Sequence, residues 1–234
     1  MAGNGIFFDD FGNANDGGYN REQNEARERQ REELIRRIIE EKGEAAYDEM
    51  IALLEKEDDD PEVREIVTEV LYRLGEKIAP KLEKTIKEKV RSGIKNDVPL
   101  LYLIDLAGDL GLRRLIADIT KSLKLYDFEE AQLVIYEALA KLGAGEQFYP
   151  LLRYMLLEGE ERFMYGAQVA MVLSYLDIPE IINDLVQAID SGDFKGEELE
   201  TIKQALTNMI NLHPSYKEIL ITLVGEDNFE NYVR

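Results

Sequence analysis

The chain has 234 residues, of which 45% are hydrophobic and 32% are charged, a composition typical of a folded protein that excludes wholesale disorder. Its 48 acidic and 28 basic residues give a net charge of −20, which disfavours nucleic acid as a partner because a phosphate backbone would be repelled. The absence of cysteine excludes disulfides and thiolate metal sites. No apolar run approaches the roughly 18 residues that a membrane span needs. The first residues lack a secretory signal, so we expect a cytoplasmic location and no membrane partner.

The first 19 residues differ from the rest of the chain. They are rich in Gly, Asn and Asp, and they carry one acidic–aromatic segment at 6–11. Because nothing in residues 1–19 repeats at helical spacing, we predict a flexible tail. Its aromatic residues Phe7, Phe8 and Phe11 are expected to dock into a groove of the same chain or of a neighbouring copy, which gives self-association through the tail as one outcome.

A charged helix is predicted at 20–43. Asn20 suits the cap position, and Gln23 stands three residues later, as in a capping box. The first half of this helix is held by opposite charges at i,i+4 spacing, such as Glu25 and Arg29. The apolar stripe begins only at Leu34, so the first half is expected to be solvated or bound to something outside the core.

From residue 44 onward, the pattern of helix, short break and helix repeats. A leucine followed by a turn residue closes every second helix at intervals of 32 to 36 residues, as Leu74-Gly75, Leu110-Gly111, Leu142-Gly143, Leu176-Asp177 and Leu212-His213. Glycine suits the left-handed position just past a helix end. The positions four and eight residues before each turn residue are also apolar, and they lie on one helical face. We therefore predict a stack of helix pairs in which neighbours share one core.

The expected chain organisation follows from these marks. The predicted helix pairs are 44–57 with 61–74, 78–92 with 97–110, 113–124 with 127–142, 146–157 with 160–176, and 179–190 with 196–212, followed by a capping helix at 214–224 and a short piece at 228–234. The chain then divides into the tail at 1–19, the charged helix at 20–43 and one helical domain at 44–234.

The first of these units resembles a HEAT repeat, a member of the armadillo-like α-solenoids. An acidic turn at 58–60 is followed by Pro61, by Val63-Arg64 opening the second helix, and by Leu74-Gly75 closing it. The resemblance is best over 44–75 and extends more weakly to about 225. It implies an all-α, α-α superhelix of about five helix pairs. The position of Arg64 is taken in the later units by Leu100, Gln132, Gly166 and Ile202, so the Asp–Arg ladder of the family is mostly missing.

In HEAT stacks the second helix of each pair lines the concave side, so the resemblance implies where a partner would bind. The residues of these helices outside the core positions are apolar and rich in Tyr, a composition typical of protein-binding grooves. They are Tyr72, Leu101, Ile104, Leu133, Tyr136, Met171, Tyr175, Leu206 and Ile210. The alternative is that these helices are buried on more than one side. Because the average field is negative, we expect a protein partner that is basic, or apolar with a basic rim.

The sequence offers no pattern that indicates catalysis. His213 is the one histidine, and its place before Pro214 predicts a helix-boundary residue. The acidic turn at 58–60 lacks the spacing of a calcium loop. We therefore expect no catalytic residue, no metal and no cofactor, and we interpret the chain as a non-enzymatic scaffold or adaptor. The alternatives are a structural homo-oligomer, an accessory subunit of an enzyme complex, and, further removed, a HEAT-like lyase or DNA glycosylase.

One segment opposes the acidic trend. Residues 73–95 are strongly basic, whereas the segment before them is strongly acidic. The favoured interpretation is charge compensation within the chain; the other is a contact with an acidic partner or a phosphate.

Overall fold

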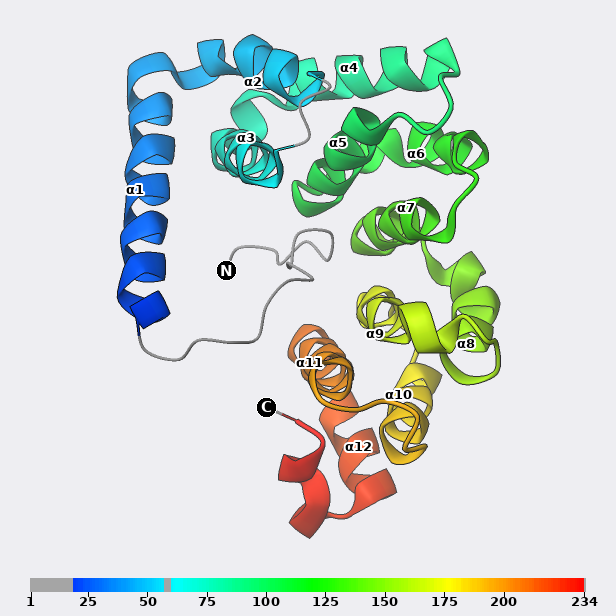
Figure 1. Ribbon diagram of the computed structural model, residues 1–234. Helices are drawn as coiled ribbons and strands as arrows, with labels where there is room; N and C mark the ends of the chain where they lie inside the picture. The colour runs from blue at the N-terminus through cyan, green and yellow to red at the C-terminus, as the bar shows by residue number, and fades with distance from the viewer. Residues whose placement is uncertain (1–18, 57–59, 234) are drawn as a thin grey trace. The chain divides into compact units, whose positions relative to one another are not determined.

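The computed structural model describes residues 19–56 and 60–233, with side chains from residue 26 onward. In these ranges all regular structure is helical, with twelve α-helices joined by short 3-10 turns and loops and without any strand (Figure 1). The all-α class predicted from the sequence is thus confirmed. The same ranges contain no helix with the length and apolarity needed to cross a membrane. Phe7, Phe8 and Phe11 of the predicted tail lie outside the described residues.

The chain forms two compact units, one ending at Leu112 and the other beginning at Arg113. The boundary falls inside the segment 44–234 that the sequence suggested as one domain, and the charged helix predicted at 20–43 belongs to the first unit.

The first unit contains five helices. They are α1 (Tyr19–Lys42), α2 (Ala46–Leu54), α3 (Pro61–Leu74), α4 (Ala79–Ser92) and α5 (Val98–Asp109). Helix α3 packs against α1, α2 and α5, and α4 packs against α5. Asp60 caps α3 as predicted, because its carboxylate accepts the backbone N–H of Glu62 at 3.0 Å and Pro61 takes the first helical position. Asp97 caps α5 in the same way, because its carboxylate accepts a hydrogen bond from the backbone N–H of Leu100 at 3.2 Å.

Ion pairs account for part of the charge pattern in the first unit. On α1, Arg31 lies 2.5 Å from Glu65 of α3, and Glu32 accepts from Arg73 at 2.6 Å. The charged half of α1 is therefore attached to α3. On the basic helix α4, Lys81 pairs with Asp48 of α2 at 2.9 Å. Lys89 pairs with Glu55 at 3.0 Å and with Asp97 at 3.3 Å. These pairs agree with charge compensation within the chain.

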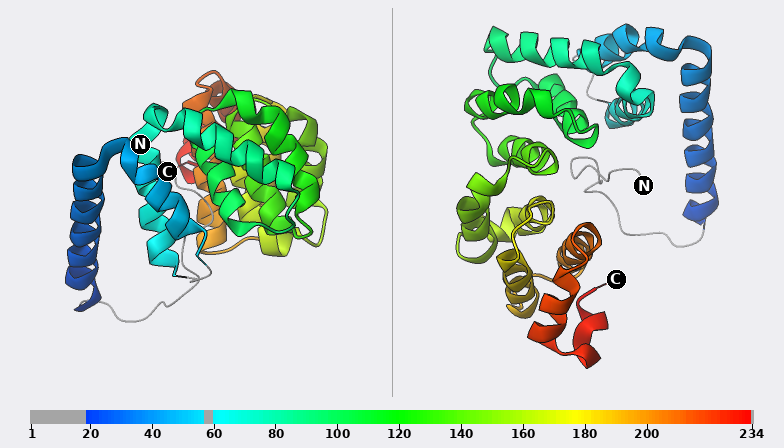
Figure 2. Two further views of the ribbon diagram at one scale, coloured as in Figure 1. Left: turned by 90° about the horizontal axis from the view of Figure 1, so that it is seen from above. Right: turned by 180° about the vertical axis from the view of Figure 1, so that it is seen from behind.

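The second unit contains seven helices. They are α6 (Ile116–Ser122), α7 (Glu129–Lys141), α8 (Tyr149–Leu157), α9 (Arg162–Leu173), α10 (Glu180–Asp190), α11 (Glu197–Leu212) and α12 (Tyr216–Val224). Helices α7, α9 and α11 lie side by side in one layer, and α8, α10 and α12 form a second layer against them (Figures 1 and 2). The core lies between the layers and includes Leu156, Val169, Leu173, Leu185 and Leu206.

Two glycines end their helices in the predicted manner. Gly111 has φ +65° and Gly143 has φ +74°, the left-handed region that favours glycine. The N–H of the next residue then reaches back five residues, from Leu112 to Ala107 and from Ala144 to Leu139, at 3.0 and 2.8 Å. This is the Schellman arrangement, which satisfies the last carbonyls of α5 and α7.

Candidate binding face

The structure corrects the predicted set of surface residues. Leu101, Ile104, Leu133, Tyr136 and Leu206 are buried in the core. The reason is that α5, α7 and α11 each pack against more than one neighbouring helix. Neighbouring helices therefore bury more than one side of each of them. On α7 every residue from 133 to 140 is buried. Since these five side chains lie inside the folded units, they are not available to a partner.

The remaining predicted residues are partly exposed. Tyr72 lies on α3 in the first unit, whereas Met171, Tyr175 and Ile210 lie on or next to α9 and α11 in the second. Met171 and Tyr175 continue a line that starts at Met164 and passes Gln168, with the i, i+4, i+7 and i+11 spacing of one helical side. We call Met164, Gln168, Met171 and Tyr175 the α9 stripe. Met164 is 73% exposed, whereas Met171 and Tyr175 are half-buried against the core.

A buried ion pair lies beside the α9 stripe. Lys141 Nζ is 2.8 Å from Glu137 Oε1 on α7, and their side chains are only 8% and 5% exposed. The ammonium of Lys141 also lies 5.3 Å from the centre of the Tyr175 ring, which connects the ends of α7 and α9 through a cation–π contact. This pair is not among the residues predicted from the sequence. The signal for it was an acid and a base at i,i+4 inside the apolar run at 131–142.

Tyrosine–carboxylate hydrogen bonds connect helices along the second unit. In each, a phenol O–H donates to a carboxylate that lies 35 to 42 residues away in the sequence. The four are Tyr149 to Asp184 at 2.7 Å, Tyr165 to Glu130 at 2.8 Å, Tyr216 to Asp177 at 2.6 Å and Tyr232 to Asp190 at 2.8 Å. Arg153 adds a second donor to the buried Asp184, with Nε at 3.2 Å from Oδ1. These bonds join parts of the second unit that are far apart in the sequence.

The phenols of three of these tyrosines are held in the protonated form. Burial and the hydrogen bond to Asp184 raise the pKa of Tyr149 to about 12. The hydrogen bond to Glu130 raises the pKa of Tyr165 to about 12. Burial and the bond to Asp177 do the same for Tyr216. A phenolate in each place would face a carboxylate and would lose the donated proton.

The raised pKa values predict a pH dependence of stability. A phenol titrates near pH 10 in the unfolded chain, so the stabilisation from these three is complete below about pH 10 and is lost as the pH rises toward 12. We expect the free energy of unfolding to fall more steeply between pH 10 and 12 in the wild type than in the triple variant Tyr149→Phe, Tyr165→Phe, Tyr216→Phe. Urea titrations at a series of pH values measure the difference. A triple variant with the wild-type slope would contradict the assignment.

His213 lies at the helix boundary that the sequence predicted. It follows the last residue of α11. Its Nδ1 lies 3.3 Å from Asp177 Oδ1, and its ring stacks on Tyr216 with centroids 5.0 Å apart. These contacts attach the corner between α11 and α12 to the turn before α10, which is a structural role.

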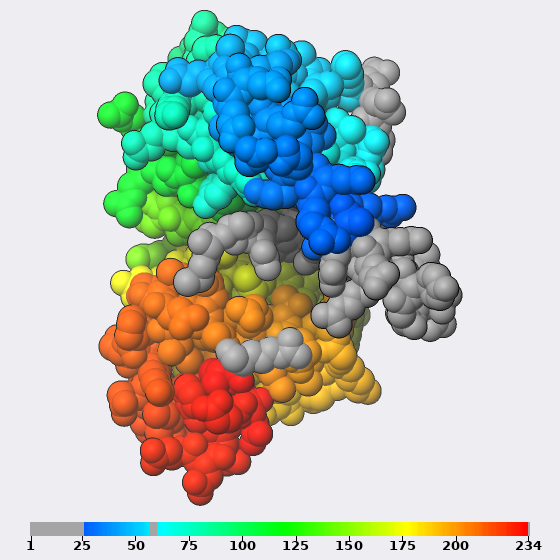
Figure 3. Space-filling view, turned by 90° about the vertical axis from the view of Figure 1, so that its left-hand side faces the viewer, coloured from blue at the N-terminus to red at the C-terminus, as the bar shows by residue number. Residues whose placement is uncertain are grey.

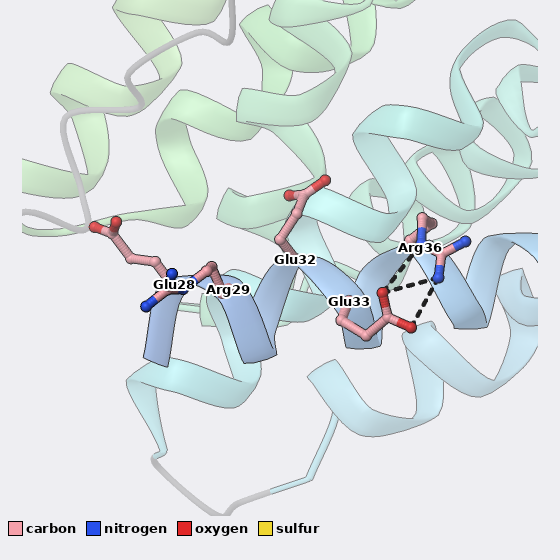
Figure 4. A pocket seen from close by; sticks show the side chains of 5 residues that line it. All are labelled: Glu28, Arg29, Glu32, Glu33 and Arg36. Atoms are coloured by element: carbon pink, nitrogen blue, oxygen red, sulfur yellow. Dashed lines mark hydrogen bonds and ion pairs between the residues drawn. The ribbon is translucent and has the colours of Figure 1, made fainter. Parts of the chain in front are cut away.

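A shallow concavity on α1 is lined by charged side chains that mostly compensate one another. The lining residues are Glu28, Arg29, Glu32, Glu33 and Arg36 (Figure 4). Arg36 donates to Glu33 and Glu40 at 2.8 and 2.9 Å, and Glu32 accepts from Arg73 of α3. The hydrogen bond from Arg73 lowers the pKa of Glu32. Because these side chains are paired with opposite charges, we interpret the concavity as an ordinary solvated helix surface and not as a binding site.

No group of three or more histidines and carboxylates within residues 19–56 and 60–233 is arranged to hold a metal ion. Asp58 and Asp59 of the acidic turn lie outside those ranges. Comparisons with protein-family models, with curated proteins and with solved structures found no match for the chain. The HEAT resemblance therefore rests on the repeat pattern of the sequence and stays a prediction.

Proposed function

We propose that the chain is a non-enzymatic scaffold or adaptor, a HEAT-like α-solenoid that binds a protein segment along the layer formed by α7, α9 and α11. The two-layer packing of the second unit supports this proposal, because consecutive helix pairs stack with their second helices side by side. The inter-repeat bonds of the tyrosines support it as well, since each spans about one repeat.

The α9 stripe is the observation that carries the proposal. It places two methionines of α9 and a tyrosine of the following turn in one line, with Met164 73% exposed and the other two half-buried. Methionine adapts its shape to different partners, and tyrosine combines apolar area with a polar tip, so both are enriched in binding surfaces. The ion pair of Glu137 and Lys141 borders the stripe and holds Tyr175 in place.

The chemistry of the partner follows from charge. The chain carries −20, so a basic segment, or an apolar segment with a basic rim, is attracted to it by the average field. Buried contact with the methionines and Tyr175 would supply affinity, and basic residues around that contact would supply specificity.

Site-specific photo-crosslinking tests the proposal. A benzophenone side chain is placed at position 164 on α9 or, as the matched control, at position 151 on α8, where Leu151 is 45% exposed in the other layer. We expect a single crosslinked partner from position 164, none from 151, and loss of the product when Met171→Glu is added. Equal crosslinking from both positions would remove the α9 stripe as the binding surface. A product consisting of two copies of the chain would favour the homo-oligomer instead.

A further inference from the structure

An apolar groove lies at the C-terminal end of the second unit and shares no lining residue with the α9 stripe. It has a volume of about 370 Å³ and is lined by Thr207, Ile210, Asn211, Pro214, Lys217, Phe229 and Val233. Cavities of this size are in the range that accepts small ligands or a few side chains. The C-terminal turn that forms one wall lies at the surface, where Figure 3 shows it in red.

The walls of the groove are anchored. The chain reverses after α12 at Gly225, with φ +83°, and the 3-10 turn η7 (Glu226–Asn231) packs back against α12. Asn228 donates to the carbonyl of Val224 at 2.9 Å, and Tyr232 donates to Asp190 of α10 at 2.8 Å. The ring of Phe229 is thus positioned opposite the side chains of α11 before anything binds, which lowers the ordering cost of binding.

One basic side chain lines this apolar groove. Lys217 is the single charged residue among the seven that line it. Its ammonium lies 5.0 Å from the centre of the Phe229 ring. Lys217 makes no ion pair within the part of the chain that the structure describes. The acids of η7, Glu226, Asp227 and Glu230, are exposed and do not line the groove. The groove therefore suits a segment that combines aromatic side chains with a carboxylate.

We propose that the groove binds the acidic–aromatic segment 6–11 of a second copy of the chain. This segment reads Ile-Phe-Phe-Asp-Asp-Phe, so it offers aromatic rings to the walls made by Ile210 and Phe229 and carboxylates to Lys217. Seven residues, 12–18, separate it from the first residue of α1, and a chain of that length spans at most about 25 Å. That reach is sufficient to enter a neighbouring molecule.

The proposed contact is heterologous, because the segment and the groove are different surfaces of each copy. Every copy has one of each, so association adds copies head to tail. It does not use the α9 stripe, so it adds a separate interaction to the proposed function. The crosslinking experiment at position 164 and the self-association experiment therefore test different surfaces, and either proposal can be wrong without the other.

A complementation experiment with full-length chains tests the contact. The Lys217→Glu variant changes the groove and keeps the segment intact. The triple variant Phe7→Ser, Phe8→Ser, Phe11→Ser changes the segment and keeps the groove intact. In sedimentation velocity, the average mass of the wild type should rise with concentration, and each variant alone should associate at least about tenfold more weakly, the loss expected for one charge-assisted contact or its apolar anchors. An equal mixture of the two variants should form a complex of twice the monomer mass, because one intact groove meets one intact segment.

Lys195→Glu is the matched control, since it makes the same charge change at an exposed lysine outside the groove and should associate like the wild type. Far-UV circular dichroism confirms that the variants are folded. A wild type that stays monomeric over the concentration range would overturn the proposal, and so would a mixture of the two variants that forms no dimer.

Discussion

Replacing Lys141 with methionine should lower the free energy of unfolding by about 3 kcal/mol or more. The substitution removes the ammonium 2.8 Å from Glu137 and leaves that carboxylate in a site where its side chain is 5% exposed. The carboxylate must then either stay charged without this cation or take up a proton, and both cost free energy. Urea denaturation followed by far-UV circular dichroism measures the loss.

Two further variants show whether burial is the cause. Adding Glu137→Leu to Lys141→Met should recover most of the lost stability, since apolar residues of similar volume replace a buried ion pair at little cost. The exposed pair of Lys84 and Glu88 on α4, 3.9 Å apart, supplies the comparison. There Lys84→Met should change the free energy of unfolding by less than about 0.5 kcal/mol. Equal effects at the two pairs would mean that Glu137 and Lys141 are solvated.

The helices were predictable because their signals are local. Asp60 and Pro61 mark the start of α3 within two residues of each other, and Gly111 and Gly143 each follow the helix they end. The period of the apolar residues then separates the remaining helices, so the predicted ranges agree with the structure to within a few residues. Periodicity shows that a helix has an apolar side and gives its position in the chain.

The candidate site was less accessible to sequence reasoning because it depends on how helices pack. Leu133 and Leu206 share the apolar character of a binding surface, yet neighbouring helices cover them. The contact between Lys141 and Tyr175 joins the end of α7 to the turn after α9, and the bond from Tyr149 to Asp184 spans 35 residues. No local rule pairs such residues. The repeat length gives the right order of separation, but it does not specify which tyrosine meets which acid.

Gly166 illustrates the same dependence and leads to a second large expected effect. In the repeat pattern predicted from the sequence, it takes the position of Arg64. A Cβ at this position would lie 2.4 Å from Cε1 and 2.7 Å from Cζ of Phe194. Phe194 belongs to the loop between α10 and α11, and its ring is buried. Helix propensity alone would make Gly166→Ala stabilising by up to about 1 kcal/mol. Overpacking against the ring costs about 1 to 3 kcal/mol, so we expect a net loss of up to about 2 kcal/mol in urea denaturation.

The companion variant Phe194→Leu separates the steric cause from propensity. Alone it should be destabilising, because it removes buried aromatic volume. Combined with Gly166→Ala it should cost less than the sum of the two single changes, since the added methyl then fills part of the space that the ring vacated. If the two costs simply add, or if Gly166→Ala raises the free energy of unfolding, the ring has room to move and the glycine is not required. The coupling thus tests whether Phe194, from the connection into the next helix pair, determines the residue that α9 can tolerate at position 166.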